Sequence, residues 1–218
     1  MNTYTVLAAM LTYPQADWLE ALDELEQALA EETSAATQTL APLFELLRGN
    51  ALIALQQNYV ATFDQNPSHS LHLFEHVHGE SRERGQAMVD LLQEYQSHGL
   101  EISAAELPDF VPLFLEYLSL LSEREAREML GDAVHVLALI GRKLEKNGSP
   151  YHTAFKVLEA LSPVAAEELP EQPVREMEET METFGPGADG AEPLLVPKVA
   201  YADMPKSLRK AGHDAGTR

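Results

Sequence analysis

The chain has 218 residues, no cysteine and a formal net charge of −20. This length suits one ordinary domain with a substantial core. The lack of cysteine excludes disulfides, cysteine-ligated iron–sulfur clusters and a thiol nucleophile. The negative charge argues against nucleic acid as a partner, because phosphate binding needs clustered lysine and arginine. A basic peptide or protein segment is the expected partner instead.

The first helical pattern covers residues 3–12, and no basic residue precedes Arg48, so the positively charged start of a secretory signal is missing. The longest strongly apolar run, near residues 134–140, is too short to span a bilayer, which takes about 20 residues. Together with the absence of cysteine, these features predict a cytoplasmic protein without direct membrane insertion.

Apolar residues recur at helical spacing along almost the whole chain, and no alternating strand pattern is convincing. The fold class is therefore predicted to be all-α. After residues 3–12, a second helix is expected to begin with Asp17 as its cap and to carry its apolar stripe to Leu29. A third helix follows with a stripe over residues 36–47, and a fourth with a stripe over residues 52–63.

The segment 59–88 is the first candidate site, because no other segment combines so many chemically active side chains. It holds four of the eight histidines, interleaved with Phe74 and with carboxylates: His69, His72, His76, His78, Asp64, Glu75 and Glu80. Turn-forming residues after Phe63 and a glycine at 79 place it largely in a connection between two core helices, the second expected to begin at Ser81. Connections held by a rigid scaffold are where binding residues concentrate.

Three interpretations of these histidines stay open. His72 and His76 are four residues apart and would share one helical face, so a zinc site with His69 or His78 as a third ligand is conceivable. The motif is not H-E-x-x-H, however, and Pro67 interrupts a helix here. The histidines could instead be hydrogen-bonded parts of a structured loop, or they could line a peptide groove. We assign no metal and no cofactor, and keep a histidine-rich metal-binding protein as the alternative.

The next helix is apolar on nearly all sides between residues 110 and 121, which indicates burial on most faces. Asp109 lies at its start, where a carboxylate is favoured by the helix dipole, and Glu116 inside it must face a partner, water or a groove. Ser122 and Glu125 form a capping box that opens a long helix. A last core helix is expected over residues 151–161, capped by Ser149 and Pro150.

Residues 166–192 hold nine acidic residues against one basic residue, which is typical of a solvated, flexible tail. We therefore divide the chain into a helical domain, residues 1–165, and an acidic tail, residues 166–218. A short amphipathic helix is conceivable over residues 173–184. No G-x-S-x-G motif, phosphate loop or dinucleotide fingerprint occurs, so the sequence predicts no enzyme.

Three runs resemble a known family: YVATFD at 59–64, SLHLFEHVHGESRERGQAMVDLL at 70–92 and LPDFVPLFLEYLSLL at 107–121. They are similar to the NarJ-type assembly chaperones of respiratory nitrate reductase, within the TorD/DmsD/NarJ group of redox-enzyme maturation proteins. The resemblance implies a single all-helical TorD-like domain without catalytic activity. Such proteins bind the N-terminal segment of the immature catalytic (alpha) subunit. They keep it competent for molybdenum-cofactor and iron–sulfur insertion before membrane docking.

The resemblance also implies site residues. The first family signature is matched by Tyr59, Phe63, Leu71, Phe74, Glu75 and Gly79. The second, an E-P-D-H-like motif, is matched by Pro108, Asp109, Glu116 and Tyr117. Leu107 separates Glu106 from Pro108, and Phe110 stands where many relatives have histidine. The expected peptide-binding set is Tyr59, Phe63, Asp64, His69, His72, Phe74, Glu75, His76, His78, Glu80, Pro108, Asp109, Glu116 and Tyr117.

The expected partner is the cofactor-free catalytic subunit, bound through its N-terminal peptide, with proteins that deliver the molybdenum cofactor as further candidates. Apolar anchors such as Phe74 and Tyr117 should supply most of the affinity, so Phe74→Ala should weaken binding more than Glu75→Gln. Protonation of His72, His76 and His78 should weaken the binding of a basic ligand. Deleting residues 166–218 should tighten binding if the tail covers the groove.

Overall fold

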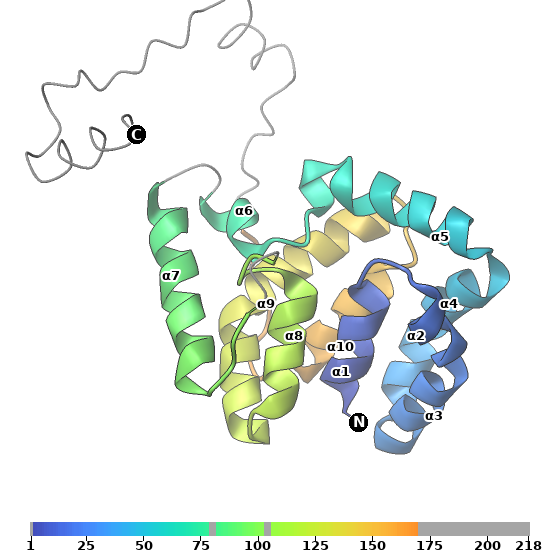
Figure 1. Ribbon diagram of the computed structural model, residues 1–218, viewed down its shortest axis with the longest axis horizontal. Helices are drawn as coiled ribbons and strands as arrows, with labels where there is room; N and C mark the ends of the chain where they lie inside the picture. The colour runs from blue at the N-terminus through green and yellow to red at the C-terminus, as the bar shows by residue number, and fades with distance from the viewer. Residues whose placement is uncertain (1, 79–81, 103–105, 170–218) are drawn as a thin grey trace, which may run out of the picture. The chain divides into compact units, whose positions relative to one another are not determined.

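The computed structural model describes residues 2–78, 82–102 and 106–169, and the regular elements in these ranges are all helical. The all-α prediction is therefore confirmed. The helices are α1 (Thr3–Leu11), α2 (Ala16–Glu20), α3 (Leu22–Glu32), α4 (Ser34–Gly49), α5 (Leu52–Tyr59), α6 (Leu73–His78), α7 (Arg82–Ser97), α8 (Val111–Leu120), α9 (Glu123–Lys146) and α10 (His152–Leu161), shown in Figure 1. A π-helical turn (Val60–Asp64) and a 3-10 turn (Pro67–His69) lie between α5 and α6.

The helices pack around one apolar core. Helix α10 packs against α9 and α4, while α1 packs against α8 and α3. Helix α7 lies at the edge of the domain beside α8 (Figure 1). The rings of Tyr95 on α7 and Tyr117 on α8 lie 4.6 Å apart. In the α9–α10 seam, a Cβ added at Gly141 would lie 2.7 Å from the Cβ of Phe155, so glycine is what lets these helices approach so closely.

The helix starts confirm some predicted caps and correct others. The capping box of Ser122 and Glu125 is present at the start of α9. Asp17, expected as a cap, lies instead in the first turn of α2, whose N-cap residue is Gln15, and the predicted single helix is interrupted at Ala21. Helix α10 begins after Tyr151 without a side-chain cap, so the predicted cap by Ser149 is wrong.

The stripe over residues 52–63 was predicted as one α-helix, but its last turn widens into the π-helical turn Val60–Asp64. The wider turn keeps both Tyr59 and Phe63 buried, with their rings 4.8 Å apart. Single π-helical turns inside α-helices are frequent at functional sites. This turn forms one wall of the pocket described below.

The chain divides into two units, and the first, Met1–Gln172, contains every described helix. After α10, Pro163 and Val164 lie over Gly131, and the Glu167 N–H donates to His135 Nδ1 at 2.9 Å. The predicted helix at 173–184 and the cap at Ser81 lie outside the described residues, and the boundary at residue 165 stays a prediction. In the described ranges, every helix is too short or too polar to cross a membrane.

Candidate functional site

A pocket of about 340 Å³ opens between the π-helical turn, the segment leading into α6 and the start of α8. We call it the α6 pocket. Five of the predicted site residues line it: Tyr59, Phe63, Asp64, His72 and Glu75. The other four residues of the lining are outside the expected peptide-binding set, although the resemblance matched one of them, Leu71, to the first family signature: Pro67, Ser70, Leu71 and Phe110. Leu71 and Phe110 could have been included, because both fall inside the matched family signatures.

The floor of the α6 pocket is aromatic and fixed. The Tyr59 hydroxyl donates to the Leu11 carbonyl at 3.0 Å. Behind the floor, the ring of Tyr151 meets Phe63 edge-on at 4.9 Å. Burial raises the pKa of Tyr59, so this phenol stays neutral and contributes an apolar face rather than a charge. The floor therefore offers preformed aromatic surface to an apolar side chain.

Asp109 lies behind the wall of the α6 pocket and holds that wall in place through hydrogen bonds. Its carboxylate is fully buried. One oxygen accepts the Phe74 N–H at 3.0 Å, and the other lies 3.2 Å from His72 Nδ1. Its carbonyl accepts the Leu73 N–H at 3.0 Å, while the Val111 N–H donates to the Leu71 carbonyl at 2.8 Å. Asp109 thus caps α6. It does not lie in the first turn of α8, where the sequence placed it, because the N-cap residue of α8 is Phe110.

His72 is the histidine that faces the α6 pocket. Its side chain is 28% exposed, and its ring lies 5.5 Å from that of Phe110. The hydrogen bond to Asp109 raises the pKa of His72, and burial only partly opposes this. Asp109 therefore orients the imidazole and favours its protonated form, which places a proton donor at the pocket wall.

The other three histidines do not line the α6 pocket. His69 is buried, donates from Nδ1 to the Thr62 carbonyl at 3.0 Å and lies 2.7 Å through Nε2 from the Asn147 amide. His76 Nε2 bonds to the Ser70 carbonyl at 2.8 Å, and burial lowers the pKa of His76. Both histidines are thus hydrogen-bonded, but to backbone and amide groups rather than to the carboxylates that were also expected, and only His69 lies in the connection, because His76 belongs to helix α6.

His78 lies 3.9 Å from a carboxylate oxygen of Glu83 on α7, and its ring is 5.8 Å from that of Phe74. Across the described ranges, no three histidine or acidic side chains stand close enough together to hold a metal ion. The described residues therefore give no support to the zinc interpretation.

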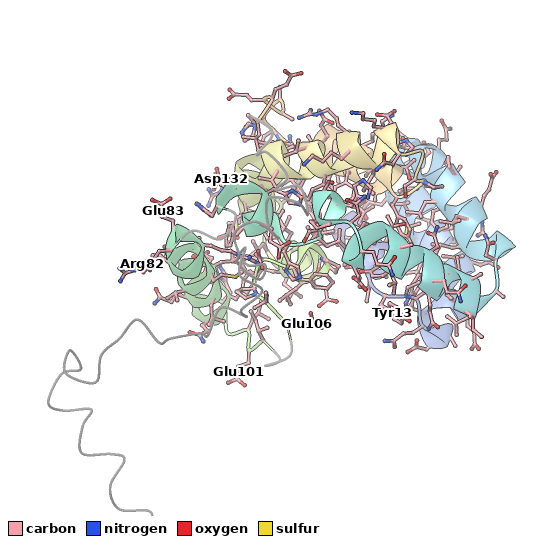
Figure 2. The ribbon with its side chains drawn as sticks, turned by 90° about the horizontal axis from the view of Figure 1, so that it is seen from above. Tyr13, Arg82, Glu83, Glu101, Glu106 and Asp132 are labelled. Carbon is pink, nitrogen blue, oxygen red and sulfur yellow. The ribbon has the colours of Figure 1, made fainter. Side chains whose placement is uncertain are left out.

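The rim of the α6 pocket is acidic. Asp64 lines the pocket and is exposed, and Glu106 lies outside the lining, but both carboxylates are near enough to Tyr59 to help raise its pKa. Figure 2 shows Glu106 on the segment that leads to α8, well apart from Arg82 and Glu83 at the start of α7. The second carboxylate of the lining, Glu75, is paired with Arg84 of α7. An aromatic floor with this rim suits a ligand that is apolar and basic.

The remaining predicted site residues lie elsewhere. Tyr117 is buried between α7 and α8, where its hydroxyl donates to Glu94 at 3.1 Å and lies 3.0 Å from His98 Nδ1. Glu116 is exposed on α8, and the Pro108 carbonyl accepts the Tyr95 hydroxyl. Phe74 is half-buried against the core, outside the pocket lining. Glu80 and Gly79 lie outside the described residues.

Known proteins resemble this chain over the region that contains the α6 pocket. The family described as nitrate reductase delta subunit matches residues 15–156. The nitrate reductase molybdenum cofactor assembly chaperone NarJ of Escherichia coli is 39% identical over 168 residues, which are 76% of this chain and 71% of that protein. The probable chaperone NarW of the same organism is 40% identical over 162 residues, or 72% of this chain and 67% of that protein.

A solved structure supports the fold. The crystal structure of a putative redox enzyme maturation protein from Archaeoglobus fulgidus superposes with a TM-score of 0.53 over 72% of this chain and 90% of that one. At 22% identity, this likeness concerns the fold alone. The family match covers well over half of the sequence and every residue of the pocket. On this evidence the chain belongs to the nitrate reductase delta subunit family.

Proposed function

We propose that this protein is an assembly chaperone of nitrate reductase, which binds the N-terminal segment of the immature catalytic subunit in the α6 pocket. NarJ and NarW are named as molybdenum cofactor assembly chaperones of nitrate reductase. In this proposal, binding occurs in the cytoplasm and holds the subunit open to insertion of the molybdenum cofactor and iron–sulfur clusters. The role needs no catalytic step of its own.

The observation that carries the proposal is the pairing of an aromatic floor with an acidic rim. The pocket volume of about 340 Å³ is near the lower end of ligand sites, which span roughly 300–1,000 Å³. It therefore has room for one or two apolar side chains, and the rest of a peptide would run across the surface. This is how an amphipathic helix docks in a groove, with apolar anchors inserted and polar residues outside.

The apolar anchors should dominate the affinity. Exposed ion pairs contribute about 0.2–1 kcal/mol each, whereas burial of one large apolar side chain contributes roughly 1.5–3 kcal/mol. Phe110 is the half-buried aromatic residue of the lining, so it can meet the ligand directly. The sequence alone favoured Phe74 for this role. We now give it to Phe110, because Phe74 does not line the pocket.

Isothermal titration tests the proposal, with a synthetic peptide of the N-terminal segment of the nitrate reductase catalytic subunit from the same organism. Phe110→Ala should weaken binding about tenfold or more, since an apolar contact in the pocket is lost. Phe74→Ala is the matched control, because it makes the same chemical change outside the pocket and should have the smaller effect. A folded wild-type protein that binds no peptide at any salt concentration would exclude this site.

A further inference from the structure

Arg84 reaches from α7 to a carboxylate of the α6 pocket. Its Nη2 donates to Glu75 Oε1 at 3.0 Å, and the two side chains are only 23% and 36% exposed. Glu75 lines the pocket, whereas Arg84 belongs to a helix that contributes no residue to the lining. Arg84 therefore already pairs with the carboxylate, Glu75, to which a basic side chain of a bound peptide would otherwise bind.

The charges around the pocket are unequally compensated. Within the described ranges, an ion pair joins Glu75 to arginine, while none joins Asp64 or Glu106 to a lysine or arginine. Both Arg84 and Glu75 are close enough to His72 to influence its pKa, Arg84 lowering it and Glu75 raising it. The guanidinium thus acts within the electrostatic field of the pocket, and it neutralises one side of the rim.

We infer that Arg84 competes with a basic side chain of the bound peptide for the carboxylate of Glu75, an inference that rests on the proposed function. Glu75 can receive a basic side chain of the peptide only when it releases Arg84. A ligand arginine presents the same planar fork as Arg84 and can replace it on equal terms, whereas a ligand lysine offers a single point charge. A ligand arginine therefore displaces Arg84 from Glu75 more readily than a ligand lysine does.

The pair could also serve only to hold α6 against α7. In that case, removal of Arg84 would loosen the pocket wall and weaken binding of the peptide. The competitor role predicts the opposite sign, because the freed carboxylate becomes available to the ligand. The direction of the change in affinity therefore separates the two roles.

The experiment titrates the same catalytic-subunit peptide into the wild type, Arg84→Gln and Arg82→Gln. Arg82 is the matched control, because it lies exposed in the first turn of the same helix and points away from the domain (Figure 2). Arg84→Gln should bind about two- to fivefold more tightly, the range expected for one partly exposed ion pair. Arg82→Gln, which changes the net charge equally, should show a clearly smaller gain.

Two further titrations link the gain to Glu75 and to the ligand cation. In a Glu75→Gln background, Arg84→Gln should no longer tighten binding. A peptide with its arginines replaced by lysine should gain less from Arg84→Gln than the original peptide does, because lysine pairs less well with the freed carboxylate of Glu75. If Arg84→Gln proves unstable by thermal unfolding, Arg84→Lys keeps the charge, loses the fork and should shift affinity in the same direction by less.

The competitor role of Arg84 is overturned if the wild type binds the peptide and folded Arg84→Gln binds it equally or more weakly. The proposed function then stays in place. A gain as large in Arg82→Gln also overturns it, because net charge would then explain the change. A wild type that binds no peptide removes the proposed function itself.

Discussion

Two contacts near the start of helix α10, one by its N-cap residue Tyr151 and one by Phe155, show how the core and the pocket of this domain differ. Phe155 closes the seam with α9 so tightly that a Cβ on Gly141 would lie 2.7 Å from its own Cβ. Tyr151 packs against the ring of Phe63, which lines the α6 pocket, and the pocket leaves about 340 Å³ open. Apolar packing fills the first region completely. The second stays open because its walls are held by something other than apolar packing.

Hydrogen bonds hold those walls. Asp109 fixes the start of α6, and His69 ties the 3-10 turn to the Thr62 carbonyl and to Asn147 at the end of α9. A buried polar group that lacks its partner costs far more than an average hydrogen bond contributes. The seam should therefore respond to side-chain volume, and the pocket wall to the loss of single polar atoms. The following substitutions test this difference.

The largest effect is expected for Asp109→Ala. The change removes the acceptor of the Phe74 N–H and the partner of His72, so it loses a helix cap and leaves polar groups unpaired. We expect the free energy of unfolding to fall by about 2–4 kcal/mol, as measured by urea denaturation. Asp64→Ala is the control, because this carboxylate is exposed, and stability should change by less than about 0.5 kcal/mol. Equal stability of both variants would contradict the role of Asp109 in the wall.

Gly141→Ala tests the seam by volume alone. The added methyl group overlaps Phe155, and overpacking of this kind costs about 1–3 kcal/mol, more than the roughly 1 kcal/mol that alanine gains in helix propensity. The control is Gly85→Ala on α7, where a new Cβ would have no atom within 4 Å, so stability should rise. Thermal unfolding of the two variants gives opposite shifts if the seam is as tight as described.

The sequence predicted the scaffold well because helical periodicity reports burial directly. The stripes over residues 36–47 and 52–63 and the capping box at Ser122 correspond to observed helices. The site was harder to predict. Family motifs placed Asp109 and Tyr117 in it, but the motif does not tell a residue that supports a wall from one that faces the ligand. That distinction depends on which helix each carboxylate caps and on the π-helical turn, and both arise from contacts between segments distant in the sequence.

Tyr117→Phe separates these two kinds of residue. The Tyr117 hydroxyl bonds to Glu94 and His98 between α7 and α8, away from the α6 pocket. Its loss should lower the free energy of unfolding by about 0.5–1.5 kcal/mol and leave the affinity for the catalytic-subunit peptide unchanged. Urea denaturation and titration of the same sample measure both quantities. A stable variant with weakened peptide binding would show that Tyr117 belongs to the binding site.

The smallest effect, a dependence of stability on pH, distinguishes His72, which lines the pocket, from His76, which does not. Asp109 raises the pKa of His72 above its ordinary value of about 6.5, so folding favours the protonated ring. This contribution is fully present below the ordinary pKa and is lost as pH rises through the raised pKa. His76 behaves oppositely, because burial lowers its pKa. Its contribution is present above the ordinary pKa and is lost as pH falls through the lowered pKa.

The stability difference between the wild type and His72→Gln should therefore shrink when urea denaturation is repeated from roughly pH 5 to roughly pH 8, the range in which histidine changes charge. The difference between the wild type and His76→Gln should grow over the same range. If both differences moved in the same direction, the hydrogen bond from His72 to Asp109 could not be what sets the wall. A mobile imidazole would then face the ligand, and the contrast between a wall held by hydrogen bonds and a seam held by packing would fail at His72, the histidine that lines the pocket.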